Sequence, residues 1–158
     1  MRILFIAVVA SALGSAAPAV AAEPTRETVT LHRVINPFSV CPTFSVIGTF
    51  DITREITTFY DRSGVPVKRI IRADITGTVT NAATGYSLPT AGVRIFHYDL
   101  TTGEFFSTGS NNTTKLPEGG KSVAGAGRLV FDAEGHLLEH VGPDSATEVA
   151  QSCAALAG

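Results

Sequence analysis

The sequence predicts an all-β domain, an antiparallel meander followed by one short C-terminal α-helix. One turn pattern recurs four times between runs that alternate apolar and polar residues, at Asp61–Gly64, Asn81–Gly85, Asp99–Gly103 and Asp132–Gly135. In each turn an Asp or Asn side chain can accept backbone N–H groups, and Gly supplies the left-handed residue that closes the turn. Turns of this kind join neighbouring antiparallel strands, so the strands are expected to pair in chain order.

Two long runs define the predicted sheet. Apolar residues occupy mainly the even positions of 44–60 and the odd positions of 67–79, a period of two that is typical of half-buried strands. Both runs exceed the usual strand length of about 5–6 residues, so they are expected to twist and bend. Bends and bulges are expected at glycines inside the strands, namely Gly48, Gly77, Gly92, Gly109, Gly125 and Gly127. This pattern favours a small β-barrel, closed or partly open, and a two-sheet sandwich is the alternative.

The remaining elements follow from the same signals. A short strand over Thr28–Ile35 precedes the meander, and Asn36-Pro37 and Cys41-Pro42 are expected to interrupt it. A fifth turn is expected at Pro117–Gly120. Further strands are predicted at Gly92–Tyr98, Glu104–Ser110, Ser122–Phe131 and His136–Val141.

The helix is predicted over residues 145–157. Ser145 and Glu148 have capping-box spacing, and Val149, Cys153 and Leu156 recur on one helical face. The whole is one domain, 23–158, with an N-terminal arm and strand over 23–43 and the meander over 44–142.

The first 22 residues are predicted to be an export signal. Arg2 precedes an apolar run over Ile3–Leu13 that is too short to span a bilayer of about 30 Å as a helix. Val20-Ala21-Ala22 fits the small-residue rule for cleavage before Glu23. The expected product is secreted or extracytoplasmic and has no membrane span.

Charge and cysteine content narrow the class of protein. The net charge is −2, which argues against a nucleic-acid partner because nucleic-acid-binding domains are usually basic. The two cysteines, Cys41 and Cys153, would lie in an oxidising compartment after export, so a disulfide between them is predicted. Such a bond would pin the helix against the segment before Phe44.

The chain resembles a group of small exported proteins common in actinobacteria. The shared features are the signal peptide and the segments Cys41–Phe44, Tyr60–Gly64, Thr80–Gly85, Gly127–Gly135 and Cys153–Leu156. The resemblance covers nearly the whole mature chain and implies the fold and export, without implying an activity.

Two histidines have the spacing of a metal-binding pair but lack its context. His136 and His140 are four residues apart, whereas the helical zinc-protease motif requires Glu directly after the first His and Leu137 stands there. On a strand the two residues would lie about 13 Å apart. No metal site is therefore assigned to this histidine pair. Asp132 and Glu139 could supply metal ligands only from other positions in the fold.

Four residues are candidates for a ligand pocket: Arg69, His97, Tyr98 and Asp99. His97 and Asp99 share a strand face with Val93 and Ile95, and if that face points inward His97 could act as a general base. Arg69 falls on the mainly apolar face of its own strand, where it could bind a ligand carboxylate. The alternatives are a hydrogen-bonded structural His, an Asp that opens its turn, and an Arg paired with a structural acid.

No serine-nucleophile elbow, phosphate loop or cofactor-binding motif is present, so no catalytic residue or cofactor is assigned. The preferred hypothesis is an exported binding or interaction module, whose partner is a small apolar ligand or an extracellular protein. Its inward aromatics would be Phe44, Phe50, Phe96 and Phe131. The alternatives are a small barrel enzyme of the cyclase or isomerase kind, and an envelope-associated structural protein with a filled core.

Overall fold

The structure is a computed structural model. It describes residues 22–143 and 145–158, apart from the side chains of Asn111, Ala124, Ser145 and Glu148. Residues 1–21, which make up nearly all of the predicted signal peptide, lie outside the described residues. The described residues form eight β-strands followed by one α-helix, α1 (Ser145–Ala157). The strands are β1 (Thr25–Val40), β2 (Ser45–Tyr60), β3 (Pro66–Asn81), β4 (Ser87–Asp99), β5 (Phe105–Lys115), β6 (Lys121–Ala124), β7 (Gly127–Phe131) and β8 (Leu137–Val141).

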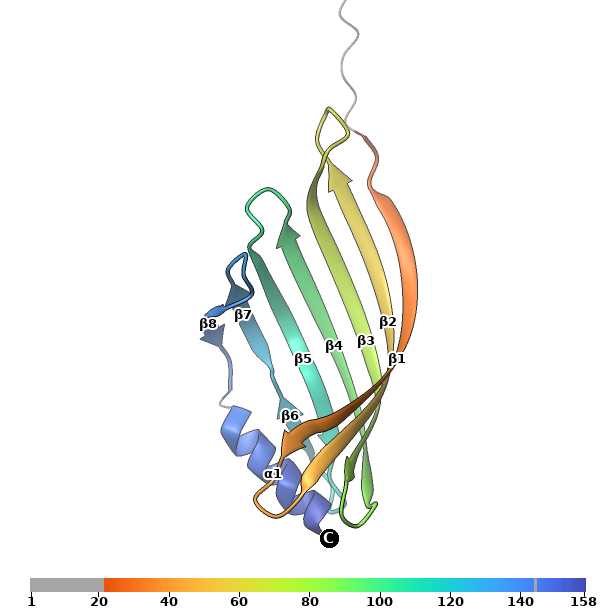
Figure 1. The fold of residues 1–158 in the computed structure, drawn as a ribbon, viewed down its shortest axis with the longest axis vertical. Coiled ribbons are helices and arrows are strands. Elements are labelled where there is room, and N and C mark those ends of the chain that lie inside the picture. Colours follow the sequence, from red (N-terminus) through yellow and green to blue (C-terminus); the bar gives the residue numbers. More distant parts are fainter. Residues whose placement is uncertain (1–21, 144) are drawn as a thin grey trace, which may run out of the picture.

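All strands belong to one antiparallel sheet, which confirms the predicted meander. The order is β1-β2-β3-β4-β5-β7-β8, and β6 pairs with β5 beside β7. The sheet is strongly twisted, and the lower end of β1 crosses in front of the other strands towards α1 (Figure 1). No ladder joins the edge strands β1 and β8 in the described part of the chain, so the sheet is not closed, which is consistent with a partly open barrel or a sandwich.

The predicted turns are confirmed down to their hydrogen bonds. The Asp61 carboxylate accepts the backbone N–H groups of Ser63 and Val65 at 2.8 and 2.9 Å, and Gly64 has φ 83°. Equivalent bonds form at the other turns, and their closing glycines also have positive φ: Asn81 with Gly85, Asp99 with Gly103, and Asp132 with Gly135. Side chains thus set where each strand ends.

Four strand predictions are wrong in their extent. β4 begins at Ser87 and not at Gly92, and β5 continues to Lys115 and not only to Ser110. The single strand expected over Ser122–Phe131 is divided into β6 and β7, because Gly125 and Gly127 adopt positive φ values of 65° and 107°. The first strand continues beyond Ile35, with a register shift between Ile35 and Ser39. It passes through Pro37 because β1 is an edge strand, where a missing N–H donor is tolerated.

The helix has the predicted bounds, and the predicted disulfide forms. Cys41 and Cys153 are joined, with their Cα atoms 5.6 Å apart and a sequence separation of 112 residues. The bond ties α1 to the segment between β1 and β2. The capping box stays a prediction, because the side chains of Ser145 and Glu148 lie outside the described residues.

The sheet has an inner face, which carries the core and α1, and an outer face. Side chains that are paired across antiparallel strands lie on the same face, so the register assigns each residue to one of them. At the lower end of the inner face, Val46, Phe50, Val79, Leu88, both cysteines and Leu156 form the buried core. We call this end, from the pair Val46–Asn81 up to the pair Ile52–Ile75, the covered half.

Above the covered half, one row of inner-face residues crosses five strands. The row consists of Arg54, Ala73, Arg94, Gly109 and Gly127, and we call it the arginine row. Beyond it, up to Thr58, Arg69 and Tyr98, lies the open half, whose apolar inner side chains are only half-buried. The inner face is therefore divided into a closed apolar end, a cationic middle and an open end.

Candidate functional site

Arg94 in β4 is the largest fully buried side chain of the inner face, with 1% of its surface exposed. Its Nε and Nη2 atoms donate to Ser107 Oγ at 3.1 and 2.7 Å, and Nη1 donates to the backbone carbonyl of Gly125. Burial lowers the pKa of the guanidinium from its usual value, because desolvation disfavours the charged form. All of its described partners are neutral.

Arg54 in β2 lies on the same row, two strands away. Its Nε atom is buried and has no hydrogen-bond partner among the described residues. Ala73 separates the two arginines and is 3% exposed, although it carries only a methyl group. Buried polar groups without a partner are rare in folded proteins and call for an explanation.

The two faces of the sheet differ in charge. On the outer face three cations are paired with acids, namely Arg72 with Asp74 at 2.8 Å, Arg128 with Glu139 at 3.4 Å, and His32 with Asp51 at 2.8 Å, whereas Lys115 lies opposite Lys121. At the paired strand positions of the inner face, Glu27 at the exposed edge is the only acid. Arg33, Arg54, Arg69 and Arg94 therefore leave an excess of positive charge on the inner face.

A cavity of about 220 Å³ lies between α1 and the covered half. Its walls are mainly apolar and include Phe38, Val46, Val79, Leu156 and the disulfide, with Asn112 and Thr114 as polar members. Gly125, whose carbonyl accepts the Arg94 hydrogen bond, also lines it. The buried guanidinium is therefore placed against the wall of this cavity.

Arg69 and Tyr98 meet at the upper end of the inner face, where they are directly paired between β3 and β4. Arg69 Nε donates to Thr58 Oγ1 at 3.4 Å. The Tyr98 ring stacks on Phe105 at 5.0 Å between centroids, and Phe105 stacks on Phe131 at 4.5 Å. These residues line the open half. Four residues along a strand, or about 13 Å, separate this row from the arginine row.

His97 and Asp99 lie on the outer face, so the inward position considered for His97 is wrong. By register His97 is paired with Ile70 and Phe106, whereas Arg94, Phe96 and Tyr98 take the inner face. Asp99 opens its own turn by accepting the N–H groups of Thr101 and Thr102 at 2.8 and 3.2 Å. The four sequence candidates are therefore divided between the two faces.

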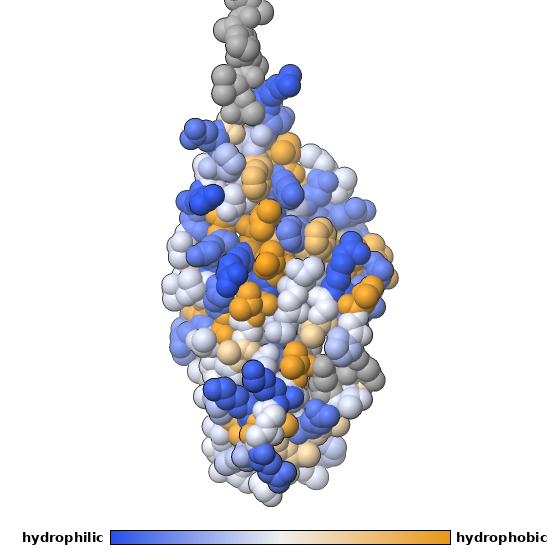
Figure 2. Space-filling model, turned by 180° about the vertical axis from the view of Figure 1, so that it is seen from behind, coloured by the Kyte–Doolittle hydropathy of each residue, from blue (hydrophilic) through white to orange (hydrophobic). Residues whose placement is uncertain are grey.

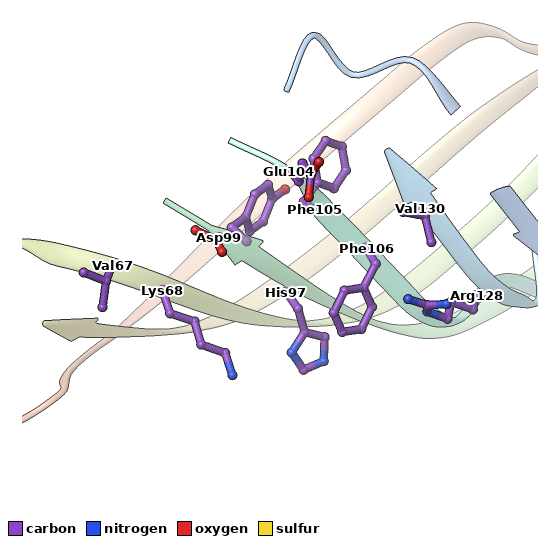
Figure 3. A pocket seen from close by; sticks show the side chains of 10 residues that line it. Val67, Lys68, His97, Asp99, Glu104, Phe105, Phe106, Arg128 and Val130 are labelled. Atoms are coloured by element: carbon purple, nitrogen blue, oxygen red, sulfur yellow. The ribbon is translucent and has the colours of Figure 1, made fainter. Parts of the chain in front are cut away.

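An open hollow of about 370 Å³ near the ends of β4, β5 and β7 is lined by His97 and Asp99 of the outer face and also by Tyr98 and Phe105 at the strand ends (Figure 3). In Figure 3 the rings of His97 and Phe106 lie side by side, and Phe105 points to the opposite side of the strands. The two rings stack at 4.4 Å, and the Arg128 guanidinium lies 5.1 Å from the Phe106 centroid. Partial burial and then the charge of Lys68 lower the pKa of His97, which favours the neutral imidazole.

Apolar side chains also gather on the back of the molecule, surrounded by hydrophilic ones (Figure 2). Because the lower end of β1 crosses in front of the sheet in Figure 1, this view from behind shows the outer face. Val93 is an exposed apolar residue of β4 on this face. Its neighbours Ile70 and Ile95 are half-buried, so both faces of the open half carry apolar side chains.

The histidine pair is divided between two environments. His136 belongs to the turn after β7, where its Nδ1 lies 3.0 Å from Asp132 Oδ2. Ligand atoms of Asp132, Glu134 and His136 lie within 4.8 Å of one another at the surface. His140 lies on the inner face of β8, paired with Leu129, and its Nε2 is 3.4 Å from the Ala126 carbonyl. The exposed cluster is therefore an ordinary turn with its own hydrogen bonds.

Arg54 and Arg94 were not among the sequence candidates, although one available signal points to Arg54. Arg54 lies between Ile52 and Ile56 at the alternate positions of its strand that are mainly apolar. A charged residue at such a position is the criterion that selected Arg69. Arg94 has the parity of Phe96 and Tyr98, and its burial depends on Ser107 and Gly125, which are distant in sequence. Sequence periodicity cannot reveal such partners.

Comparison with known proteins found no matching family model, curated protein or solved structure. Among the described residues, α1 is the one helix, and it is not long and apolar enough to cross a membrane. Function must therefore be argued from the geometry of the inner face.

Proposed function

We propose that the protein is an exported binding module that holds a small ligand with an apolar body in the cavity between α1 and the sheet. The observation that carries this proposal is the cavity of about 220 Å³ with mainly apolar walls, beneath a helix held in place by a disulfide. Ligand sites are typically concave and mostly apolar, with a few polar groups that fix orientation.

Two further features support the proposal. The cavity is slightly smaller than typical drug-sized pockets of about 300–1,000 Å³, which suits a short aliphatic or single-ring ligand. The disulfide is typical of proteins in oxidising compartments, in agreement with the predicted export signal. A binding module also accounts for a chain that carries no recognised catalytic motif.

Native mass spectrometry of the mature protein, recovered from the culture medium of its own organism, tests the proposal. We expect extra mass that is released when the protein is unfolded under non-reducing conditions. A protein without extra mass, which also binds no short-chain acid or alcohol offered to it, would contradict the proposal and favour a filled core.

Val149→Phe tests the location of the ligand. Val149 is half-buried on the helix face that lines the cavity, so a larger ring should occupy the space and abolish binding. Gln151→Phe is the matched control, because Gln151 is exposed on the same helix. Circular dichroism and thermal unfolding verify that both variants fold. Equal ligand binding by the two variants would exclude this cavity.

A further inference from the structure

We infer that the ligand is a neutral molecule whose polar group both donates and accepts hydrogen bonds at Asn112, as a carboxamide or a hydroxyl does. This inference rests on the proposed function and adds the chemical class of the ligand. The apolar body packs against α1 and the core, and the polar group lies against β5, which contributes Asn112 and Thr114 to the cavity wall.

Asn112 has a buried side-chain amide without a hydrogen-bond partner. The residue is 8% exposed and lines the cavity, and its amide has no hydrogen bond to another described residue. Among the described residues, Arg54 Nε is the one unpaired side-chain nitrogen or oxygen that is fully enclosed, so the Asn112 amide keeps some accessible surface. Because buried polar side chains are nearly always hydrogen-bonded, this amide calls for a partner inside the cavity.

Asn81 shows, by contrast, how a buried asparagine with a structural role is bonded. Asn81 is 2% exposed, and its Nδ2 donates to the Leu156 carbonyl at 3.0 Å. Its Oδ1 accepts the backbone N–H groups of Ala83 and Thr84 at 2.9 and 3.3 Å. Both amide atoms therefore hold a turn and the end of α1. Asn112 lies inside β5 and has no such task.

Two hydroxyl groups of the cavity wall require a donor from the ligand. Thr114 Oγ1 donates to Thr90 Oγ1 at 3.4 Å, and Ser152 Oγ donates to Ser122 Oγ at 2.9 Å. A hydroxyl has only one hydrogen, so towards the cavity Thr114 and Ser152 can only accept. A ligand group that only accepts would leave these oxygens and the Asn112 Oδ1 without a donor. The ligand group must therefore carry an N–H or O–H.

The cavity wall also indicates that the ligand is neutral. No described residue of the wall is charged, and Ser39 is its remaining polar member. Arg94 does not line the cavity, because its guanidinium is directed to Ser107 and to the Gly125 carbonyl behind the wall. A carboxylate or an ammonium group here would lose its hydration without gaining an ion pair.

Isothermal titration calorimetry at neutral pH with benzamide, acetophenone and benzoate tests the inference. The three probes share a ring and a carbonyl, and they differ only in the neighbouring group, which is an N–H donor, a methyl group or a charged oxygen. We expect benzamide to bind at least about tenfold more tightly than either of the others, since only benzamide pairs with both atoms of the Asn112 amide. The α-methylbenzyl alcohol, compared with benzamide, distinguishes a hydroxyl ligand from a carboxamide ligand.

Asn112→Leu should abolish the preference for benzamide and leave the binding of acetophenone unchanged. Its melting temperature without ligand should be unchanged or higher, because an unpaired buried amide is removed. Thr113→Val is the matched control, because Thr113 is the next residue of β5 and lies on the outer face, paired with Ala91. It should keep the preference.

Nuclear magnetic resonance locates the contact without a variant. The side-chain N–H signals of Asn112 should shift when benzamide is added and shift much less with acetophenone. Signals that respond equally to both probes would contradict a hydrogen bond from the ligand to this amide.

The outcomes separate the two proposals. Equal binding of benzamide and acetophenone, tighter binding of benzoate, or a preference that survives Asn112→Leu would each overturn the inference and leave the proposed function in place. If no probe binds but native mass spectrometry shows extra mass, a released molecule that is charged or lacks an N–H or O–H would overturn it, and a neutral donor would support it. Neither probe binding nor extra mass would overturn both.

Discussion

The covered and open halves of the inner face are made by the same strands but are buried to different extents. In the covered half Val46, Phe50 and Val79 are at most 4% exposed. In the open half Ile56, Ile71 and Phe96 show the same alternation and are only half-buried. The difference comes from α1 and the disulfide, which cover one end of the sheet. The alternation of apolar and polar residues along each strand determines which side chains lie on the inner face. Helix α1, which is distant in sequence, determines how much of that face is buried.

The charges follow the same division. The covered half has an apolar core, and the arginine row begins where this core ends. A buried cation with neutral partners adds little to stability, because its desolvation is not offset by an ion pair. The comparison therefore predicts that stability depends mainly on the apolar core of the covered half.

The largest expected effect is loss of the disulfide. Replacing both Cys41 and Cys153 with Ser should lower the free energy of unfolding by about 4 kcal/mol, because the bond closes a very long loop. Urea unfolding measures the loss, and hydrogen exchange should localise it to α1 and the covered half. Reduction of the unmodified protein should have the same effect. A loss below about 1 kcal/mol would mean that packing alone holds α1 in place.

A matched pair of phenylalanines compares the halves directly. Phe50→Ala should cost about 3–5 kcal/mol, because it leaves a cavity in the core. Phe96→Ala should cost only about 1–2 kcal/mol, since this side chain already contacts solvent. Denaturant unfolding of both variants measures the difference. Equal losses would indicate that something covers the open half in solution, and analytical ultracentrifugation would then reveal self-association.

Arg54→Met should have little effect on stability, or raise the free energy of unfolding by up to about 1 kcal/mol. The change removes a buried, unpartnered Nε and keeps an apolar side chain of similar length. Thermal unfolding in the absence of ligand measures it. A large loss of stability would show that Arg54 has a structural role.

The smallest expected effect is on acid stability. Hydrogen bonds from the Thr101 side chain and from the backbone of Thr101 and Thr102 lower the pKa of Asp99. Hydrogen bonds from the Ser63 side chain and the backbone of Val65 outweigh desolvation and lower the pKa of Asp61. Because the folded pKa values lie below the unfolded value of 3.8, this stabilisation is present above about pH 4 and is lost as the pH falls through the folded values.

The covered end has no such dependence at its turn, because Asn81 there does not titrate. Acid should therefore loosen the open end first, and hydrogen exchange between about pH 4 and pH 2 would detect it. Asp99→Asn should reduce the acid effect and preserve the turn at neutral pH. If amides in α1 and in the turn at Asn81 exchange first instead, the covered half is the more acid-sensitive one, which contradicts this prediction.

Much of the fold was accessible from local sequence signals. The Asp or Asn turns, the alternation of 44–60 and 67–79, the helix over 145–157 and the pairing of the two cysteines all appear in the structure. Each rests on a neighbour a few residues away or, for the disulfide, on the presence of only two cysteines. The division into β6 and β7 was not predicted, because glycines occur both within a bent strand and in the break between two strands.

The candidate site was accessible only in part. Arg69 and Tyr98 have the inner parity, and the structure pairs them, whereas His97 and Asp99 lie on the outer face. Parity within one strand cannot say which face becomes the inner one, because both faces of β4 carry apolar residues. The register with β3, together with the position of α1, makes that choice.

The amino-acid sequence by itself determined where the chain turns and which residues alternate, because these depend on local hydrogen bonding and side-chain periodicity. It also determined which cysteines pair, because it contains only two. Only the tertiary structure decided that the sheet stays open, that a cavity remains under α1 and that Arg54 and Arg94 flank Ala73. Those features require strand pairing and helix packing between distant segments. Their outcome depends on the three-dimensional fit of the whole chain.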